Sequence, residues 1–217
     1  MISLVVFEQL FKLKLNNCSI LVFVMVNKVK FNRDEVITKA QMLFWKKGFS
    51  TTSTRDLQTV VDMRPGSIYS AFGSKEGLYS ESLKVYATQL KLLLASHIEN
   101  SETMLDGLHA FVVTVLESAE DGCEVCMLIK ASTEFDHTQP KLKTLTDDLL
   151  QQFEHDLSTL FDIAQQRGEL PNTHSPLEYA RLFQIQFTGL RSYLHRPMSK
   201  PMTEQLIGMM FTLIKNY

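Results

Sequence analysis

The sequence is poor in cysteine, glycine and proline. Three unevenly placed cysteines are too few for a disulfide scaffold, so we expect a reducing compartment, the cytoplasm. Nine glycines and six prolines argue against a collagen-like or disordered chain, and 45% apolar residues are enough for a sizeable core. No zinc-ligand spacing, Ser-His-Asp set, HExxH motif or glycine-rich phosphate loop is visible, so we predict neither a cofactor nor an enzyme.

Long uncharged runs are also missing. The longest, Leu15 to Asn27, has 13 residues, whereas a bilayer-spanning helix needs about 20. No basic segment precedes this run and no small-residue cleavage site follows it, as a secretory signal would require. We therefore expect no membrane association. Residues 1–28 are interpreted as an extension, and the polar lead that begins at Met25 suggests the hypothesis that translation starts there.

A strong net charge is absent, since the total is −2, but the charge is unevenly divided. Residues 27–80 carry nine Lys/Arg and five Asp/Glu, giving +4, while residues 81–217 carry 11 against 18, giving −7. A basic first third joined to an acidic remainder suggests a segment that faces nucleic acid. Chance scatter of surface charge remains the alternative until a motif supports this interpretation.

Helix caps delimit the first part of the chain. Asn32 followed by Glu35 predicts a capping box, and Gly48 predicts the end of the same helix. Thr52 is expected to cap a second, short helix, and Pro65 suits the first position of a third. Ser74 should then cap a long fourth helix. The predicted helices are 33–47, 52–61, 65–72 and a fourth that begins after residue 74.

The remaining apolar pattern repeats every 3.6 residues and has no strand-like alternation. The predicted fold class is therefore all-α, with an N-terminal three-helix helix-turn-helix module and a larger C-terminal helical bundle, about nine helices in total. The domains are expected at residues 29–89 and 90–217. The later predicted helices are 103–119, 124–134, 142–168, 176–195 and 202–216.

Two short helices joined by a tight turn are typical of the helix-turn-helix. The segment 49–79, FSTTSTRDLQTVVDMRPGSIYSAFGSKEGLY, resembles the tetracycline-repressor (TetR) family, and the resemblance covers about residues 30–80. Asp62 departs from the usual turn glycine and Gln58 from the usual alanine. The resemblance implies a repressor that binds double-stranded operator DNA as a homodimer on a palindromic site, and a small-molecule inducer that releases it. An activator or global regulator of the same family remains an alternative.

The resemblance also implies roles for particular residues. Phosphate contacts would position the module, and base contacts would specify the sequence. Lys75 lies in a first helical turn, where the helix dipole disfavours a cation, and only an external anion such as phosphate readily explains this placement. The residues expected at phosphates are Thr52, Tyr69 and Lys75, and those expected at base edges are Arg64, Pro65, Gly66, Ser67 and Ser70.

The last two predicted helices, within residues 176–216, carry more apolar surface than one face requires. One face would pack on the domain's own core and the other on the same helices of a second subunit. A fully buried helix pair in a monomer is the alternative. The family implies a ligand pocket in the C-terminal bundle, and its candidate lining residues, which could equally be ordinary core, are Phe111, Phe135, Phe153, His155 and Phe183.

Cys123 and Cys126 allow three interpretations. If a helix begins at residue 124, its dipole would lower the pKa of the Cys123 thiol, although nearby acidic residues would oppose this shift. Cys123 would then sense oxidants or electrophiles, with Cys126 as the resolving thiol. Alternatively, both are small buried hydrophobic residues. A redox enzyme that uses this CxxC pair would need a βαβ context, which the chain does not predict.

Overall fold

The computed structural model describes residues 32–118, 123, 125–194 and 199–217. They form one compact unit, Asn32–Tyr217. Within the described residues there are nine α-helices and no strand, which confirms the all-α prediction. The extension and Met25 lie outside the described residues. The helices are α1 (Arg33–Lys47), α2 (Thr54–Val61), α3 (Pro65–Phe72), α4 (Lys75–Glu99), α5 (Met104–Glu117), α6 (Met127–Glu134), α7 (Pro140–Gln166), α8 (Pro176–Tyr193) and α9 (Lys200–Lys215).

The predicted caps of α1 and α4 are confirmed. The Asn32 side chain accepts a hydrogen bond from the Asp34 backbone N–H at 3.1 Å, and Ser74 accepts one from the Gly77 N–H at 3.0 Å. Glu35 pairs with Lys39 at 2.7 Å, and the described cap of α1 consists of the hydrogen bonds that Asn32 accepts, without the reciprocal bond of a full capping box. These caps satisfy amide groups that the first helical turn leaves without a partner.

The prediction that Thr52 caps α2 is wrong by one residue. Ser53 is the N-cap, and it exchanges hydrogen bonds with Asp56 in a full capping box. Thr52 is completely buried, and its hydroxyl donates to the Gly48 carbonyl at 2.6 Å. The Thr52 hydroxyl is thus directed at the end of α1, and Ser53 accepts the hydrogen bond from the first turn of α2 instead.

The predicted start of α6 at residue 124 is also wrong. The helix begins at Met127, and Cys126 occupies its N-cap position. Cys123 lies four residues before the helix and is buried, so the helix dipole does not act on its thiol as predicted. The redox-sensor hypothesis therefore loses its premise. Cys126 is half-buried, and its Sγ accepts a hydrogen bond from the Tyr86 hydroxyl at 3.5 Å.

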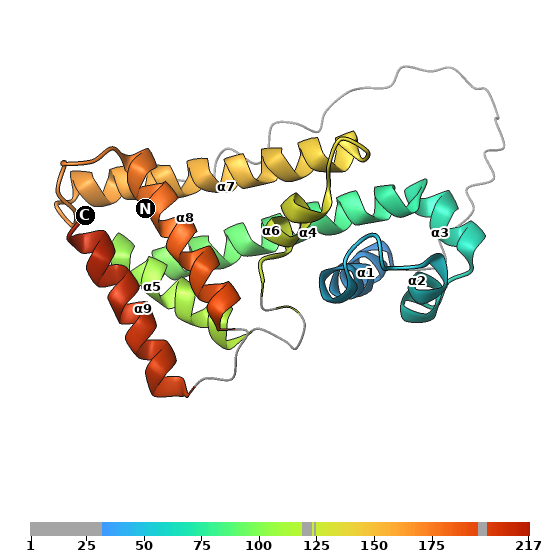
Figure 1. Cartoon of the computed structure of the whole chain (residues 1–217), viewed down its shortest axis with the longest axis horizontal. Coiled ribbons are helices and arrows are strands. Elements are labelled where there is room, and N and C mark those ends of the chain that lie inside the picture. The colour runs from blue at the N-terminus through green and yellow to red at the C-terminus, as the bar shows by residue number, and fades with distance from the viewer. Residues whose placement is uncertain (1–31, 119–122, 124, 195–198) are drawn as a thin grey trace, which may run out of the picture. The chain divides into compact units, whose positions relative to one another are not determined.

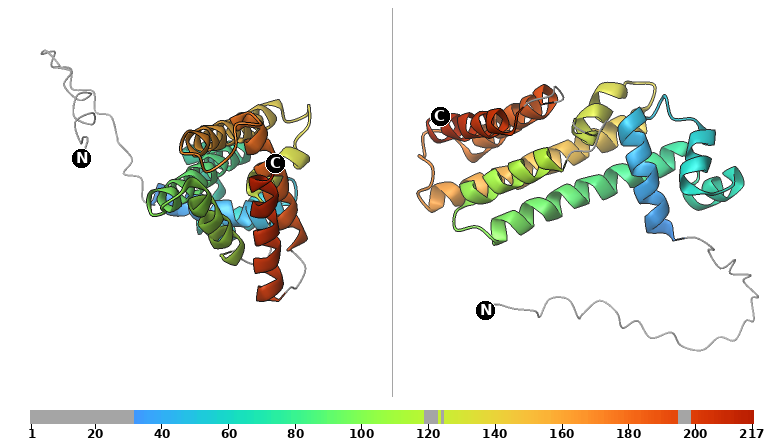
Figure 2. Two further views of the ribbon diagram at one scale, coloured as in Figure 1. Left: turned by 90° about the vertical axis from the view of Figure 1, so that its left-hand side faces the viewer. Right: turned by 90° about the horizontal axis from the view of Figure 1, so that it is seen from below.

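The long helices α4 and α7 run side by side along the unit (Figures 1 and 2). Helices α1, α2 and α3 gather around the first part of α4, whereas α5, α8 and α9 lie toward its other end (Figure 1). An aromatic cluster holds the first group in place. Tyr79 of α4 contacts the rings of Phe44, Phe49 and Phe135 edge-on, with centroids 4.8, 5.1 and 5.3 Å away. Such pairs stabilise beyond the area they bury.

The predicted ligand-lining residues are mostly core. Phe111 and Phe183 are fully buried and pack against the Phe187 ring at 5.6 Å, while Phe135 belongs to the Tyr79 cluster. His155 is exposed on α7. Phe153 lines a small cavity of about 220 Å³ beside α4 and α6. In the described part of the chain, no helix is long and apolar enough to cross a bilayer.

Candidate nucleic-acid interface

The turn between α2 and α3 depends on Asp62. This residue has φ 52° and ψ 46°, the left-handed conformation, and its N–H donates to the Gln58 carbonyl at the end of α2. Asp adopts this region more readily than most residues because its short polar side chain forms local hydrogen bonds. The turn therefore forms without the glycine that the family usually has here.

One face of α3 anchors it and the other is open. Ile68 and Phe72 are buried against the rest of the module, and Arg33 of α1 stacks on Phe72 at 4.4 Å while donating to the Ala71 carbonyl at 2.9 Å. Pro65 is half-buried at the first helical position. The exposed face carries five of the eight predicted contact residues, namely Arg64, Gly66, Ser67, Tyr69 and Ser70.

Gly66 has no role in packing. A Cβ added there would meet nothing within 4 Å, and the residue has no positive φ that would require glycine. The protein's own packing would therefore allow a larger residue at position 66, yet the sequence has glycine there. A backbone without a side chain lets a partner approach the helix closely.

Tyr69 joins the two short helices at their surface. Its ring is 40% exposed, and its hydroxyl lies 2.9 Å from the Thr54 hydroxyl at the start of α2. Both hydroxyl groups are exposed and can turn toward a polar partner. This geometry suits a phosphate contact, because a tyrosine can pack its ring while its hydroxyl binds a polar group.

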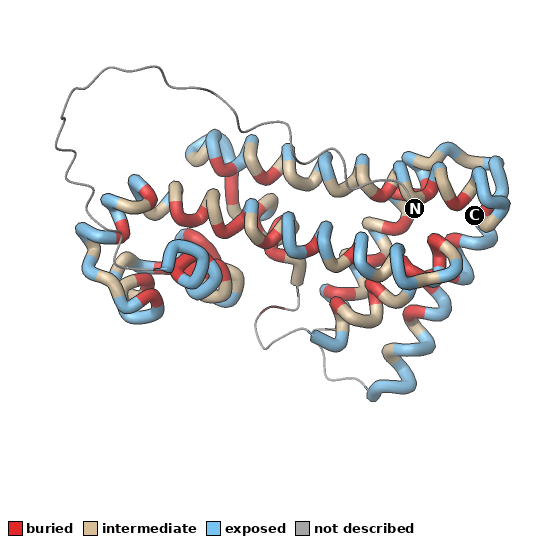
Figure 3. Tube along the Cα trace, turned by 180° about the vertical axis from the view of Figure 1, so that it is seen from behind, coloured by how far each residue is buried: buried red, intermediate tan, exposed pale blue. Residues whose placement is uncertain are grey.

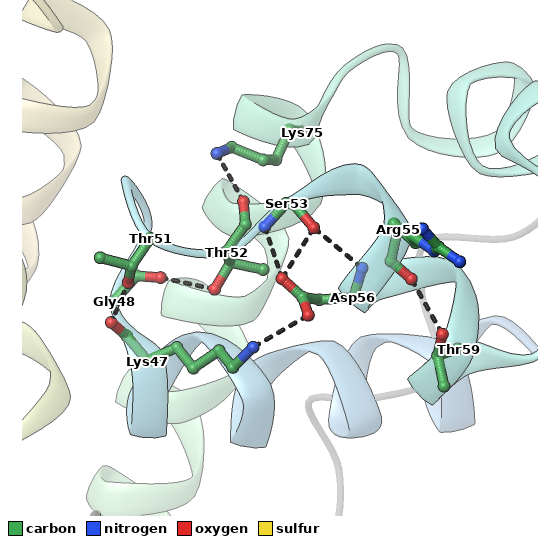
Figure 4. Close-up of polar contacts among 9 residues, drawn as sticks. All are labelled: Lys47, Gly48, Thr51, Thr52, Ser53, Arg55, Asp56, Thr59 and Lys75. Atoms are coloured by element: carbon green, nitrogen blue, oxygen red, sulfur yellow. Dashed lines mark hydrogen bonds and ion pairs between the residues drawn. The ribbon is translucent and has the colours of Figure 1, made fainter.

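The predicted reason for the position of Lys75 has to be corrected. Its ammonium group donates to the Phe49 carbonyl at 2.9 Å and the Thr52 carbonyl at 2.8 Å, and it lies 4.2 Å from the centre of the Phe49 ring. Figure 4 shows the side chain directed at the Thr52 backbone. The placement of this cation therefore has an internal explanation, and the argument that only an external anion accounts for it is wrong.

An ion pair joins α1 to the first turn of α2. Lys47 Nζ lies 2.9 Å from the Asp56 carboxylate, which also accepts from the Ser53 backbone and hydroxyl (Figure 4). The hydrogen bond from Lys47, together with those from Ser53, holds the pKa of Asp56 well below its usual range. The carboxylate thereby stays ionised at the amino end of α2, where the helix dipole favours negative charge.

Helix α6 holds the segment between α1 and α2 in place, and the sequence did not predict these contacts. The Glu134 carboxylate accepts from the Phe49 and Ser50 backbone N–H groups at 2.9 and 2.6 Å. Lys130 donates to the Trp45 and Lys46 carbonyls at the end of α1, at 2.7 and 3.0 Å. Both partners are more than 80 residues away in the sequence, so no local pattern could have predicted these contacts.

The short helices α2 and α3, the turn at Asp62 and the exposed face of α3 define a helix-turn-helix module. Residues 36–81 match the family model "Bacterial regulatory proteins, tetR family". The chain is 31% identical over 107 residues to the HTH-type transcriptional repressor BdcR of Escherichia coli strain K12, an alignment that covers 46% of this chain and 52% of BdcR. The chain thus spans about half the length of this relative.

Solved structures extend the likeness to the whole unit. A TetR family transcriptional regulator from Cytophaga hutchinsonii has a TM-score of 0.74 at 20% identity, covering 85% of this chain and 93% of that one. A cysteine mutant of the TetR family regulator CifR, complexed with 26-bp double-strand operator DNA, has a TM-score of 0.69 at 22% identity, covering 86% and 97%. This chain is thus similar to TetR family transcriptional regulators, in sequence over residues 36–81 and in fold over most of its length, as its sequence indicated. The proteins that it matches are transcriptional regulators.

Proposed function

We propose that this protein is a transcriptional repressor of the bacterial cytoplasm. It would bind a double-stranded operator through α3. The observation that carries the proposal is the exposed α3 face with Gly66, whose missing side chain nothing in the protein requires. The major groove is about 12 Å wide and admits a helix that carries small residues. Support also comes from the family, since BdcR is a repressor and CifR binds operator DNA.

Specific residues would divide the work between phosphates and bases. Arg64 would read base edges in the groove, while Gly66, Ser67 and Ser70 would allow close approach or contact bases themselves. Tyr69, with its exposed hydroxyl, would bind a phosphate. Thr52 would act only by supporting the start of α2, because it is completely buried and its hydroxyl donates to the Gly48 carbonyl.

The test is a gel-shift titration with DNA fragments from around the gene itself, at several salt concentrations. A specific fragment should bind at least a thousandfold more tightly than random DNA, and binding should weaken steeply as salt rises. Equal affinity for all fragments would overturn the proposal.

We further propose that the operator-binding form is a homodimer made through α8 and α9. Each helix has one buried and one exposed face, which Figure 3 colours red and pale blue. Ile185, Met209 and Leu213 are 71, 54 and 59% exposed, more than isolated surface residues explain. Beside them, the Gln186 Oε1 atom is buried without a hydrogen-bond partner among the described residues of this single chain. A second copy would cover the apolar face and bring a donor to this atom.

Sedimentation of the full chain at micromolar concentration tests the dimer. We expect a mass of two chains, whereas a stable monomer would contradict the proposal. The two α3 helices would then meet successive major grooves of a palindromic operator, about 34 to 36 Å apart or a multiple of that. A small-molecule inducer that releases the dimer from DNA completes the proposed function.

A further inference from the structure

A cavity of about 320 Å³ lies between the proposed DNA-reading module, which consists of α1 to α3, and the body of the protein, which consists of the remaining helices. Helix α1 forms one side of it with Gln41 and Trp45, and α4 and α8 supply Tyr86, Leu93 and Arg191 on the others. Binding clefts for small molecules typically begin at about 300 Å³. At roughly 30 Å³ per water molecule, this space corresponds to about ten waters or a ligand of similar size.

Gln41 is the polar group in this lining that lacks a full set of partners. Its side chain is only 3% exposed, and its Nε2 donates to Gln89 Oε1 at 3.0 Å. The remaining atom, Gln41 Oε1, is buried and accepts no hydrogen bond from the part of the chain that the structure describes. An amide oxygen that is removed from water without a donor is costly, so such atoms are normally paired. A donor from outside the protein is therefore expected at this position.

Other groups around the cavity describe the rest of its occupant. Trp45, Leu90 and Leu93 offer apolar surface to a ring or a short chain. The Tyr86 hydroxyl accepts from the buried Arg191 guanidinium at 3.3 Å and donates to Cys126 Sγ, so these polar atoms are already engaged with one another. The combination favours a mainly apolar ligand with one hydrogen-bonding end.

We propose that this cavity binds a small uncharged alcohol, phenol or amide, which donates a hydrogen bond to Gln41 Oε1 and packs its apolar part against Trp45 and Leu93. The site contains α1, the helix that also contacts α2 through the Lys47–Asp56 ion pair. A ligand there touches the DNA-reading module and the body at once. If its affinity differs between the DNA-bound and released arrangements, it shifts the balance between them.

This inference rests on the proposed function for its regulatory part, while ligand binding itself can be measured without DNA. Phenol, benzyl alcohol and benzamide are the probes, titrated into the full-length protein and followed by calorimetry and by the rise in Tm. The test variant is Gln41→Leu, which removes the acceptor at similar volume. Gln152→Leu on α7 is the matched control, because Gln152 lines the separate 220 Å³ cavity.

We expect at least one probe to bind wild-type protein and the Gln152→Leu control alike, and to bind Gln41→Leu about tenfold more weakly. Circular dichroism of the double variant Gln41→Leu/Gln89→Leu, in which neither amide is left unpaired, shows whether the fold survives. Binding that is equal in wild type and Gln41→Leu would overturn the inference, as would a crystal soaked with the probes in which Gln41 Oε1 contacts only water.

The effect on DNA separates the two proposals. A probe that binds at Gln41 and changes operator affinity at least fivefold supports both. If the protein binds its operator and no probe occupies the cavity or alters that affinity, the cavity inference fails alone. If the probe binds but no DNA is recognised at any ligand concentration, the repressor function fails and the site remains.

Discussion

Replacing Lys75 by methionine tests whether this residue stabilises the module or binds phosphate. Methionine keeps a long apolar stem but loses the charge and the donors. The variant loses two hydrogen bonds from an ammonium group to the Phe49 and Thr52 carbonyls and a cation–π contact with the Phe49 ring. Hydrogen bonds to charged groups contribute about 1.5 to 3 kcal/mol when well buried, and a cation–π contact contributes about 0.5 to 1 kcal/mol at an exposed site.

Lys75 is only partly buried, and water can reach the released carbonyls, so the loss should be smaller than the sum. We expect Lys75→Met to lower the free energy of unfolding by about 2 kcal/mol. In a chain of this size, that corresponds to a fall in Tm of roughly 4 to 8 °C. Lys84→Met, on an exposed part of the same helix, is the control and should change Tm little.

The salt dependence of operator binding distinguishes the two roles of Lys75. A lysine that contacts no phosphate contributes nothing to counterion release, so the slope of log affinity against log salt should stay the same in Lys75→Met. Affinity itself should fall, because the segment leading into α2 is held less firmly. A slope reduced by about 0.9 with an unchanged Tm would show that Lys75 binds a phosphate and would refute this reasoning.

Three further changes test other parts of the account. Arg64→Ala should cost about 1 to 3 kcal/mol of binding to the preferred operator and relax selectivity at particular base pairs, whereas equal losses on every sequence in a mutated-operator panel would contradict a base contact. Asp56→Asn should have a lower Tm than wild type at pH 7, and this difference in Tm should become smaller as the pH is lowered. The reason is that a depressed folded pKa gives stability that is complete above the unfolded value of about 4 and is lost as pH falls through the folded one; a deficit that stays constant down to pH 2 would disprove this. Ile185→Asp should convert the dimer to monomer in sedimentation while leaving helix content unchanged, and a surviving dimer would place the interface elsewhere.

Local signals predicted most of the helices correctly. Asn32, Ser74 and Pro65 mark the starts of helices because capping and a fixed φ act within one turn, and apolar periodicity reports the buried face. The exposed face of α3 followed from its resemblance to the family. These features depend on residues that are neighbours in the sequence.

Errors arose where distant contacts decide. Thr52 and Ser53 are both good capping residues, and burial of Thr52 against Gly48 selects Ser53. Lys75 is explained by carbonyls more than 20 residues away. The burial of Arg191 could have been predicted from the sequence, because this residue follows Phe183 and Phe187 at intervals of four on the buried face of α8. A charged residue at such a position indicates a buried polar site.

The most direct test of the central claim is selection of DNA by the full-length protein from a random double-stranded library, followed by sequencing. The account predicts an enriched inverted repeat whose half-site centres lie about 10 base pairs, or a multiple of that, apart. It also predicts that the enriched positions include those relaxed by Arg64→Ala. Enrichment of no sequence, or of a single motif without a symmetric partner, would contradict a homodimer that reads its operator through two α3 helices.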